Sequence, residues 1–396
     1  MNKIKTIGKC KICYGEIFAK PILRLKKMPK AAQFFPSKKQ FKIDKGINLK
    51  VYQCSECGMV QLKSVPVKYY KSVITATSFS KKTKTIRLNE IKKIVIKYKL
   101  QKKKIIEIGC GKGAMLDIFK KAGTYPFGME WNVNSIASGR KNNKNIIKGF
   151  IEDVKKIPLG PFDGFVCYNF LEHLPDPNKA IKNIFNNIKD NALGVITVPN
   201  FSYLLKTNCF YEFVPDHLLY FKKKNIKYLF KRNSFQIIEC KTINNDNDIQ
   251  IIVKKITNNK NIEIKKRKIK RLNLLKKYKK VENLIKNLKS IVIEYKNNNK
   301  KIAVWGAGHR TLALLSLSNL HEIEYIIDSA DFKQGKYAPI LHKKIVHPNF
   351  LRTNKVDLLI IMVPGIYPDE VAKYVANMRL GINIIKLNNN KIIHLN

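Results

Sequence analysis

Residues 105–113 read IIEIGCGKG and decide the fold, because an apolar run passes directly into a loop with glycine at every second position. The run predicts a buried strand, and apolar side chains at helical spacing over residues 114–119 predict a helix after the loop. Glycine lets the backbone turn tightly and approach a ligand where a Cβ would collide, and the helix start offers free N–H groups. The stretch therefore predicts a ligand-binding loop, although many such turns carry glycine for packing alone.

An acidic residue follows at the spacing expected for a second parallel strand. Glu130 lies 21 residues after Gly109, and a carboxylate at that strand end can accept both hydroxyls of a ribose. Residues 162–169 and 194–200 predict two more buried strands that end in polar residues. Together these segments predict an α/β fold with a largely parallel sheet.

The order and spacing of these elements resemble a class I S-adenosylmethionine-dependent methyltransferase over about residues 80–255. A dinucleotide dehydrogenase would instead carry Gly-x-Gly-x-x-Gly, whereas this loop reads GCGKG. The resemblance implies S-adenosyl-L-methionine as cofactor. The cofactor-binding residues that it implies are Glu107, Gly109, Cys110, Gly111, Gly113, Glu130, Asp153 and Asn169.

The chain is strongly basic, with 77 Lys and Arg against 28 Asp and Glu and a formal net charge of +49. Only nine of the basic residues are Arg, and the lysines occur with Asn and Ile throughout, as an AT-rich coding bias would produce. A nucleic-acid surface favours Arg, with its bidentate fork. We therefore expect a solvated lysine surface that attracts small anions, and no nucleic-acid partner. No apolar run is long enough to span a membrane and no signal segment opens the chain, so we expect a cytoplasmic protein without membrane insertion.

Two cysteine pairs, Cys10-x-x-Cys13 and Cys54-x-x-Cys57, have the spacing of a structural zinc site. Two intervening residues let both sulfurs of a pair face one tetrahedral ion, and four thiolates close the site to water. The alternative is redox pairs or incidental thiols, but disulfides are rare in cytosolic proteins. The other cysteines, which lie in apolar surroundings, are expected to fill the core: Cys110, Cys167, Cys209 and Cys240.

Residues 28–62, which surround the second cysteine pair, resemble the zinc-binding module that precedes sugar C-methyltransferases. The following segment, with Tyr70 and Ser78, resembles the one that closes over the active site in that family. The resemblance implies that Tyr70 and Ser78 contact the substrate. The alternative is a surface connector.

Residues 210–221 read FYEFVPDHLLYF, and the aromatic side chains around one acid–histidine pair are too dense for an ordinary connector. The stretch resembles the Tyr-His-Glu-His segment of the same family, which implies catalytic roles for Asp216 and His217. Val214 stands where the family has a candidate catalytic tyrosine, and Tyr211 or Tyr220 could replace it. A neutral histidine is a base poised near neutral pH, so His217, oriented by Asp216, is our first choice for proton removal.

His173 is a second catalytic candidate, because it lies just past the strand that ends near Asn169, where a ligand cleft is expected. It could act as an acid–base partner or stabilise an enolate. The alternative is a histidine at a helix start that packs on the cofactor. The catalytic residues predicted are therefore His217, Asp216, His173 and Tyr220.

A long helix and a second α/β unit are predicted after residue 256. Apolar residues alternate at spacings of four and three from Leu274 to Tyr295, which predicts a helix packed on its own domain or, alternatively, a dimer helix. From residue 301 a strand ends in Gly306-x-Gly308, and residues 324–328, 356–362 and 383–387 predict further strands of a Rossmann-like half.

This last region resembles the carboxy-terminal domain of the C-methyltransferases, which packs against the nucleotide of a nucleotide-sugar. Pro339–Ile340 replaces the usual Pro-Gly, and a packing domain that binds nothing is the alternative. The substrate-binding residues implied by the resemblance are Gly306, Gly308, His309, Arg310, Asp328 and Lys333.

The sequence thus predicts an α/β protein with four parts: a zinc-binding module (1–75), a class I methyltransferase core (80–255), a Lys-rich helical segment (256–298) and a smaller Rossmann-like domain (299–396). The resemblance implies S-adenosylmethionine-dependent C-methylation of a nucleotide-linked keto-deoxysugar, by a monomer or homodimer. An O- or N-methyltransferase of a sugar is one alternative. A nucleic-acid-binding zinc protein with a degenerate methyltransferase fold is another.

Overall fold

The computed structural model describes residues 6–72, 81–257, 269–365 and 367–395, and it contains two compact units. Unit 1 comprises Met1–Ala19, Gln53–Phe201 and Leu218–Arg271, and unit 2 comprises Lys20–Tyr52, Ser202–His217 and Leu272–Asn396. Two internal segments of the chain thus group with the carboxy-terminal part: Lys20–Tyr52 from the expected zinc module and Ser202–His217 from the expected core.

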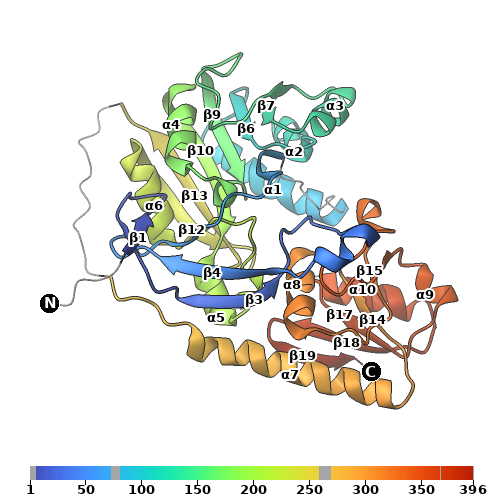
Figure 1. Ribbon diagram of the computed structural model, residues 1–396. Helices are drawn as coiled ribbons and strands as arrows, with labels where there is room; N and C mark the ends of the chain where they lie inside the picture. Colours follow the sequence, from blue (N-terminus) through green and yellow to red (C-terminus); the bar gives the residue numbers. More distant parts are fainter. Residues whose placement is uncertain (1–5, 73–80, 258–268, 366, 396) are drawn as a thin grey trace. The chain divides into compact units, whose positions relative to one another are not determined.

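Unit 1 is built on a seven-stranded sheet with the order β12-β13-β10-β9-β6-β7-β8 (Figure 1). Numbered along the chain, the strands run 3-2-1-4-5-7-6 across the sheet. Five neighbouring strands, β8, β7, β6, β9 and β10, are parallel to one another, and β13 is antiparallel to both β10 and β12. The strands are β6 (Lys104–Ile108), β7 (Tyr125–Glu130), β8 (Ile146–Lys148), β9 (Phe162–Tyr168), β10 (Ile188–Pro199), β12 (Phe235–Ile243) and β13 (Asp248–Lys255).

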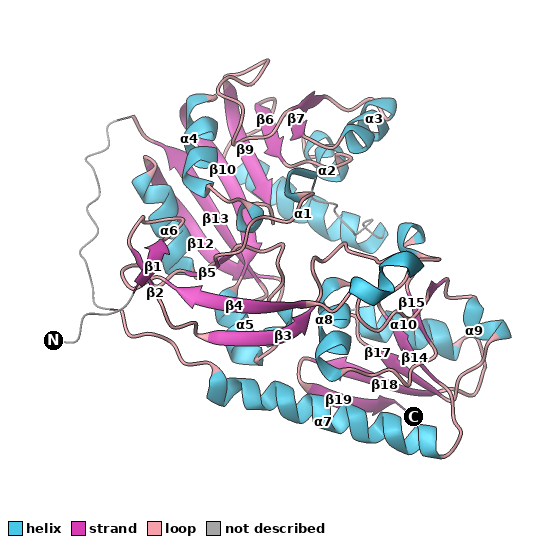
Figure 2. Ribbon diagram, in the orientation of Figure 1, coloured by secondary structure: helices cyan, strands magenta, loops and turns pink. Residues whose placement is uncertain are grey.

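Helices cover both faces of this sheet, as the long apolar strands require (Figure 2). Val166 of β9 packs in one cluster with Val95 and Phe119, so α1 and α2 lie on that face. The neighbouring Phe165 points to the opposite face, because side chains alternate along a strand. There it contacts Phe235, which also contacts rings of α4 and α6. The helices of unit 1 are α1 (Lys81–Lys97), α2 (Ala114–Lys121), α3 (Val133–Lys141), α4 (Pro177–Asn186) and α6 (Lys223–Arg232).

Short elements complete unit 1. The strands β1 (Thr6–Lys9) and β2 (Glu16–Phe18) form an antiparallel pair. The strand β5 (Val60–Leu62) pairs antiparallel with β11 (Leu219–Tyr220). Two 3-10 turns are η2 (Tyr70–Ser72) and η3 (Leu171–His173).

Unit 2 contains a six-stranded sheet of order β16-β15-β14-β17-β18-β19, in which only β19 is antiparallel to its neighbour. This sheet is the predicted Rossmann-like half. Its strands are β14 (Ile302–Trp305), β15 (Tyr325–Ile327), β16 (Ile345–Val346), β17 (Leu358–Ile361), β18 (Asn383–Asn388) and β19 (Lys391–Leu395). Its helices are α8 (His309–Ser318), α9 (Phe350–Thr353) and α10 (Tyr367–Ala376), and β3 (Leu23–Met28) pairs antiparallel with β4 (Ile47–Gln53). Further short elements are η1 (Lys38–Ile43), η4 (Phe210–Glu212) and η5 (Asp331–Lys333), and α5 (Phe201–Thr207) crosses the boundary between the units.

The predicted long helix is α7 (Leu275–Asn297), and it packs on its own unit. Its buried side chains Val281, Leu284, Leu288 and Val292 follow helical spacing, and the helix contacts α8 and β14. The predicted seam placed Ile285 where the structure buries Leu284. In the part of the chain that the structure describes, no helix is both long and apolar enough to cross a membrane.

Candidate functional site

The candidate cofactor site of unit 1 lies where the strand order reverses. β6 lies between β7 and β9 in the sheet. The chain passes from β6 to β7 and β8 on one side and then from β8 to β9 on the other, and it leaves each of these parallel strands at its carboxyl end. In open α/β sheets, ligands bind outside these ends at such a switch point. The predicted residues Glu107, Gly109, Gly111, Glu130 and Asn169 all lie at this edge.

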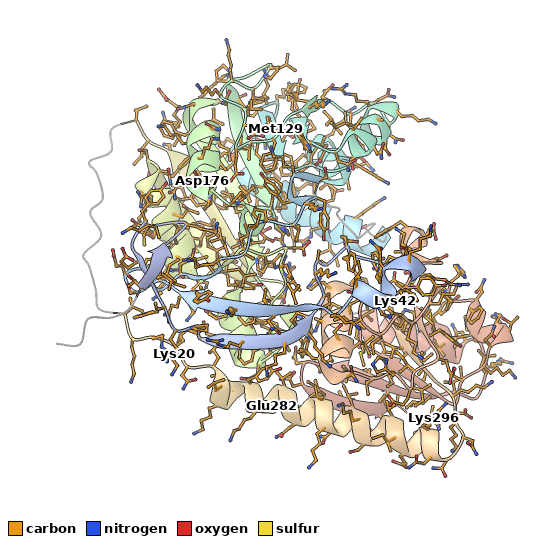
Figure 3. All side chains as sticks on the ribbon, viewed as in Figure 1. Lys20, Lys42, Met129, Asp176, Glu282 and Lys296 are labelled. Atoms are coloured by element: carbon orange, nitrogen blue, oxygen red, sulfur yellow. The ribbon has the colours of Figure 1, made fainter. Side chains whose placement is uncertain are left out.

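The glycine loop has the backbone shape that its sequence predicts. Gly109, Gly111 and Gly113 have φ values of 74°, 54° and 74°, in the left-handed region that L side chains rarely adopt. A Cβ on Gly109 would lie 2.6 Å from the ring of Phe170. The N–H groups of Gly109 and Cys110 donate to the carbonyl oxygen of Met129, which is one of the residues labelled in Figure 3. The loop is therefore tied to the end of β7.

Glu130 is held by the main chain on both oxygens. Its Oε2 accepts from the N–H of Gly111 at 2.9 Å, and its Oε1 accepts from the N–H groups of Trp131 and Asn132 at 2.9 and 2.7 Å. Burial raises the pKa of Glu130, and these three hydrogen bonds oppose the shift. The carboxylate is thus fixed in place, with lone pairs remaining for a diol.

Glu107 carries a buried oxygen that the protein does not satisfy. The side chain is 5% exposed, and its Oε2 has no hydrogen-bond partner among the described residues. Burial, and then the charge of Glu130, raise the pKa of Glu107 well above its usual value. An orphaned buried carboxyl group requires an explanation, and a ligand ammonium group would provide it.

Aromatic side chains surround a lysine beside Glu130. The Nζ of Lys71 lies 5.0 Å from the ring centre of Trp131 and 5.2 Å from that of Phe150, and it pairs with Asp153. Tyr70 meets Phe150 edge to face at 5.5 Å. Asp153, predicted to bind cofactor, is therefore engaged by a protein cation. The sequence did not point to Lys71, Trp131 and Phe150, although Trp131 directly follows the strand-end acid.

Asn169 connects the ends of three strands. Its Oδ1 accepts from the hydroxyl of Thr197 at 2.6 Å, and its Nδ2 donates to Asp248 at 3.5 Å. Its φ of 44° is unusual for a residue other than glycine. Asn169 therefore sets the path of the chain that leads into η3.

The turn η3 carries a buried acid next to the predicted His173. Glu172 is 1% exposed, its Oε2 has no hydrogen-bond partner among the described residues, and burial raises its pKa to about 8. Its Oε1 lies 3.9 Å from Nε2 of His173. A carboxyl group of this kind keeps its proton at neutral pH. The sequence alone predicted no role for Glu172, because only tertiary burial raises its pKa.

The other predicted catalytic pair, Asp216 and His217, belongs to unit 2. Asp216 is buried, and its Oδ2 accepts from the N–H of Ala32 at 2.7 Å. The ring of His217 lies 6.0 Å from that of His309, whose pKa is lowered by burial. Orientation of His217 by Asp216 stays a prediction. Tyr220 is buried in β11 of unit 1, where its ring packs on Phe201 at 6.3 Å.

Arg310 was predicted to bind substrate, but its guanidinium contacts protein groups. Its Nη1 lies 3.2 Å from Oε1 of Glu212, and its Nη2 donates to Tyr211 Oη at 3.3 Å and to Asn389 Oδ1 at 3.4 Å. Tyr211, considered as a replacement for the family tyrosine, also donates its hydroxyl to the carbonyl of Asn389 at 3.0 Å. Both side chains thus connect η4 to the turn before β19.

The second glycine loop repeats the arrangement of the first. Gly306 has a φ of 116°, and the N–H of Ala307 donates to Asp328 at 2.7 Å, as Gly111 donates to Glu130. Asp328 also accepts from the N–H of Ala330 at 2.9 Å and from Lys333 Nζ at 3.0 Å. A Cβ on Gly308 would meet nothing within 4 Å, so the start of α8 is open. Of the predicted substrate residues, Ser78 lies outside the described part of the chain.

The four predicted cysteines lie together in unit 1. Cys10 and Cys57 have sulfurs 3.7 Å apart, and Cys13 and Cys54 have sulfurs 3.4 Å apart. Four thiolates at the Zn–S distance of about 2.3 Å would have sulfurs about 3.8 Å apart, so the group could hold one tetrahedral ion. The amide of Asn178 donates to the carbonyl groups of Lys11 and Ile12, and that of Asn225 donates to the carbonyl of Cys57. Both cysteine loops are therefore anchored to helices of the core.

Comparison with protein families gives two overlapping matches. Residues 85–240 match a methyltransferase domain, and residues 234–385 match the C-methyltransferase C-terminal domain. The first range lies within the predicted core, whereas the second begins at residue 234, before the predicted start of the carboxy-terminal domain at residue 299.

Curated relatives match only part of the chain. The "Ubiquinone biosynthesis O-methyltransferase" of Vibrio campbellii is 27% identical over an alignment of 119 residues, which covers 26% of this chain and 50% of that protein. The protein of the same name from Acinetobacter baumannii is 29% identical over an alignment of 87 residues, which covers 20% of this chain and 37% of that protein. The chain thus spans half or less of the length of these relatives.

Solved structures that match part of the chain include the PH0226 protein of Pyrococcus horikoshii, with 15% identity and a TM-score of 0.40 over 48% of this chain and 99% of that chain. A second is an S-adenosylmethionine-dependent methyltransferase of Clostridium acetobutylicum, with 12% identity and a TM-score of 0.38 over 47% and 96% of the two chains. The two family matches, which together span residues 85–385, identify the chain as a member of the C-methyltransferase family.

Proposed function

We propose that the chain is an S-adenosylmethionine-dependent methyltransferase that acts on carbon in a nucleotide-linked keto-deoxysugar. The observation that carries the cofactor assignment is the unsatisfied, buried Glu107 oxygen beside a glycine loop of left-handed backbone. The match of residues 234–385 to the C-methyltransferase C-terminal domain supports carbon as the acceptor atom.

The residues at the switch point fit the parts of this cofactor. Glu107 would accept from the ammonium group of the methionine part, and Glu130, fixed by three N–H groups, would accept from the ribose hydroxyls. Trp131 and Phe150 offer ring surfaces for the adenine. When bound, the cofactor supplies a methyl group that is electrophilic because it is attached to a sulfonium.

His217 is proposed as the base that removes a proton from the carbon next to the sugar carbonyl. A neutral imidazole suits this task near neutral pH. Leu218, the next residue in the chain, donates its N–H to the carbonyl oxygen of Glu172 at 2.8 Å. Glu172 keeps its proton at neutral pH because burial raises its pKa to about 8, so its O–H could stabilise negative charge on an enolate oxygen. His173 remains the alternative base.

Loss of the substrate's alpha proton tests this assignment directly. Nucleoside-diphosphate keto-deoxysugars are incubated with the protein in deuterated water without cofactor, and exchange is followed by NMR. His217→Asn should slow exchange by roughly 10²–10⁴-fold, the usual contribution of a positioned base, while calorimetry shows normal cofactor binding. His173→Asn is the matched comparison. Exchange at the wild-type rate in His217→Asn would exclude this residue as the base.

O-methylation is the second candidate. The curated relatives are O-methyltransferases by name, and Val214 stands in place of the family tyrosine. An oxygen acceptor needs no enolate, so the wild-type protein would then show no exchange. NMR of the product made with ¹³C-methyl cofactor separates a methyl group on carbon from one on oxygen.

We further propose that Cys10, Cys13, Cys54 and Cys57 hold one structural zinc ion. The sulfur separations and the paired two-residue spacing support this proposal. The ion would fix two loops whose carbonyl groups are bound by Asn178 and Asn225, so its role would be to hold the amino-terminal segment on the core.

A further inference from the structure

Unit 2 contains a cavity that none of the proposed roles uses. Its volume is about 550 Å³, within the range of roughly 300–1,000 Å³ typical of small-molecule sites. The residues that line it and carry the argument are Lys301, Tyr325, Lys344, Phe350, Arg352 and Lys355.

The cavity lies at the opposite edge of the sheet from the second glycine loop. Lys301 directly precedes β14 and Lys344 directly precedes β16, whereas Gly306 and Asp328 directly follow the last residues of β14 and β15. Because these strands are parallel, their amino ends share one edge and their carboxyl ends the other. This pocket is therefore separate from the edge that carries Gly306 and Asp328, which the resemblance predicts to bind the substrate, and the inference does not rest on the proposed function.

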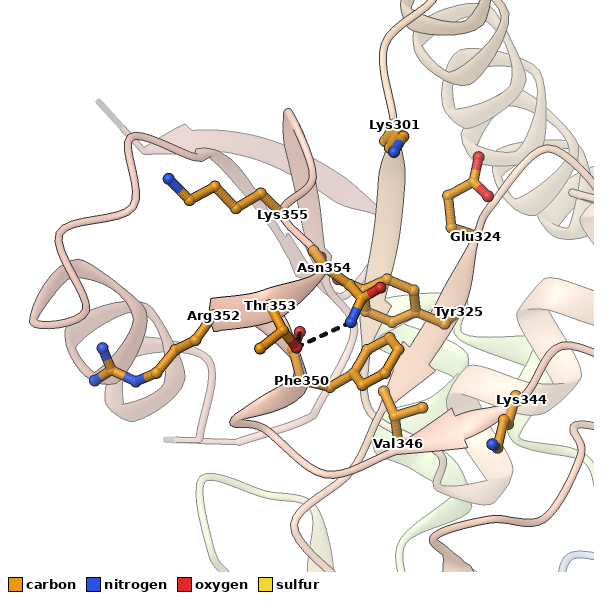
Figure 4. Close-up of a pocket in the computed structure, with 10 residues that line it drawn as sticks. All are labelled: Lys301, Glu324, Tyr325, Lys344, Val346, Phe350, Arg352, Thr353, Asn354 and Lys355. Atoms are coloured by element: carbon orange, nitrogen blue, oxygen red, sulfur yellow. Dashed lines mark hydrogen bonds between the residues drawn. The ribbon is translucent and has the colours of Figure 1, made fainter.

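An aromatic pair forms the centre of the pocket (Figure 4). The rings of Phe350 and Tyr325 meet edge to face with centres 5.0 Å apart. Tyr325 is buried and its hydroxyl donates to the carbonyl of Asn354, so its ring is fixed, whereas Phe350 keeps 37% of its surface exposed. Thr353 and Asn354 are joined side chain to side chain beside the rings. A rigid, partly open aromatic surface of this kind suits a flat ring.

Charge around the rings is predominantly positive. Lys301, Lys344, Arg352 and Lys355 contribute four cations, and the only acid in the lining, Glu324, lies 3.6 Å from the ammonium of Lys296 on α7. Lysine is common everywhere on this chain, so positive charge alone would not define a site. The volume of the cavity, the fixed aromatic pair and the cations together define one.

We propose that this pocket binds a nucleoside diphosphate, with the base stacked on Phe350 and the phosphates bound by Lys301 and Lys344. Stacking on aromatic side chains is tolerant of base identity, because every base has a π-face. Arg and Lys are the usual partners of phosphate groups.

Calorimetry with ADP as the probe tests the proposal on the full chain. Phe350→Ala should weaken ADP binding about ten-fold, as expected for loss of one base–aromatic stack. The double substitution Lys301→Gln with Lys344→Gln should weaken it by a similar factor and reduce its dependence on salt. The matched control neutralises two exposed lysines of α7 outside the pocket, Lys279→Gln with Lys286→Gln, and should leave binding unchanged. Circular dichroism checks that each variant folds.

Two further measurements identify the ligand and the edge of the sheet at which it binds. Inorganic pyrophosphate should bind more weakly than ADP and be insensitive to Phe350→Ala, and Asp328→Asn at the opposite edge should leave this ADP site intact. The proposal is overturned if ADP does not bind, if pyrophosphate binds as tightly as ADP, or if the α7 control weakens binding as much as the pocket variants.

Discussion

Arg310 and Glu212 form an ion pair of 3.2 Å in which the two side chains are only 15% and 23% exposed. The same guanidinium contacts Cys209 and Tyr211, so one side chain of α8 holds the segment 209–212. Asn390 adds hydrogen bonds to the carbonyl groups of Thr207 and Asn208. This segment lies a few residues before Asp216 and His217, so we propose that Arg310 helps to position them.

Removing one partner of this pair should be costly, because the remaining charge stays buried. We expect Glu212→Ala to lower the free energy of unfolding by about 3 kcal/mol. The double variant Arg310→Met with Glu212→Leu should lose less than Glu212→Ala, since no uncompensated charge remains. Denaturant unfolding of the variants measures the difference. A double variant less stable than Glu212→Ala would contradict a buried-pair role.

A comparison of Gly109 with Gly123 distinguishes the effect of backbone strain from the effect of a steric clash. Both have positive φ, of 74° and 93°, but a Cβ on Gly109 would lie 2.6 Å from Phe170, whereas one on Gly123 would meet nothing within 4 Å. We expect Gly123→Ala to cost about 1 kcal/mol of stability and to keep cofactor binding. Gly109→Ala should cost more and lose cofactor affinity. Thermal unfolding and calorimetry measure both, and equal behaviour of the two variants would refute the assignment of the loop.

The buried Glu172 predicts a stability that falls with pH. Its pKa is about 8 in the folded chain against 4.5 normally, so between these values the folded state holds a proton that the unfolded state has released. Stability from this group is therefore complete below pH 4.5 and is lost as pH rises through 8, with a slope of up to about 1.4 kcal/mol per pH unit. Relative to wild type, Glu172→Gln should become steadily more stable from pH 5 to about 8 and then level off.

Glu239→Gln is the control for that experiment, because its shift has the opposite sign. Hydrogen bonds from Lys241 and Lys97 lower the pKa of Glu239 to about 2, so its contribution is constant above pH 5 and disappears only in acid. If the difference in stability between the wild-type protein and Glu172→Gln does not change between pH 5 and 8, Glu172 is ionised in the folded protein.

Metal content tests the cysteine cluster. Protein purified without added zinc should contain about one equivalent of zinc by elemental analysis. Cys13→Ser should lower both the zinc content and the melting temperature, whereas Cys240→Ser, outside the cluster, should leave the zinc content unchanged. Folded wild-type protein free of metal would contradict the proposal.

The sequence by itself determined the strand–loop–helix at residues 105–119, the strand-end Glu130, the four-cysteine cluster and the Rossmann-like carboxy-terminal sheet. These features were predictable because local physical chemistry specifies them. Apolar periodicity, glycine in a tight turn and two-residue cysteine spacing act over a few neighbouring residues.

Only the tertiary structure decided which groups face one another. The partners Lys71 and Asp153 are 82 residues apart, and Arg310 and Cys209 are 101 residues apart. The high pKa of Glu172 results from burial, which no local pattern encodes. The pocket around Phe350 likewise gathers residues that precede four different strands, and their spacing in the sequence has no period. Long-range packing produces these features, so they became visible only once the chain was folded.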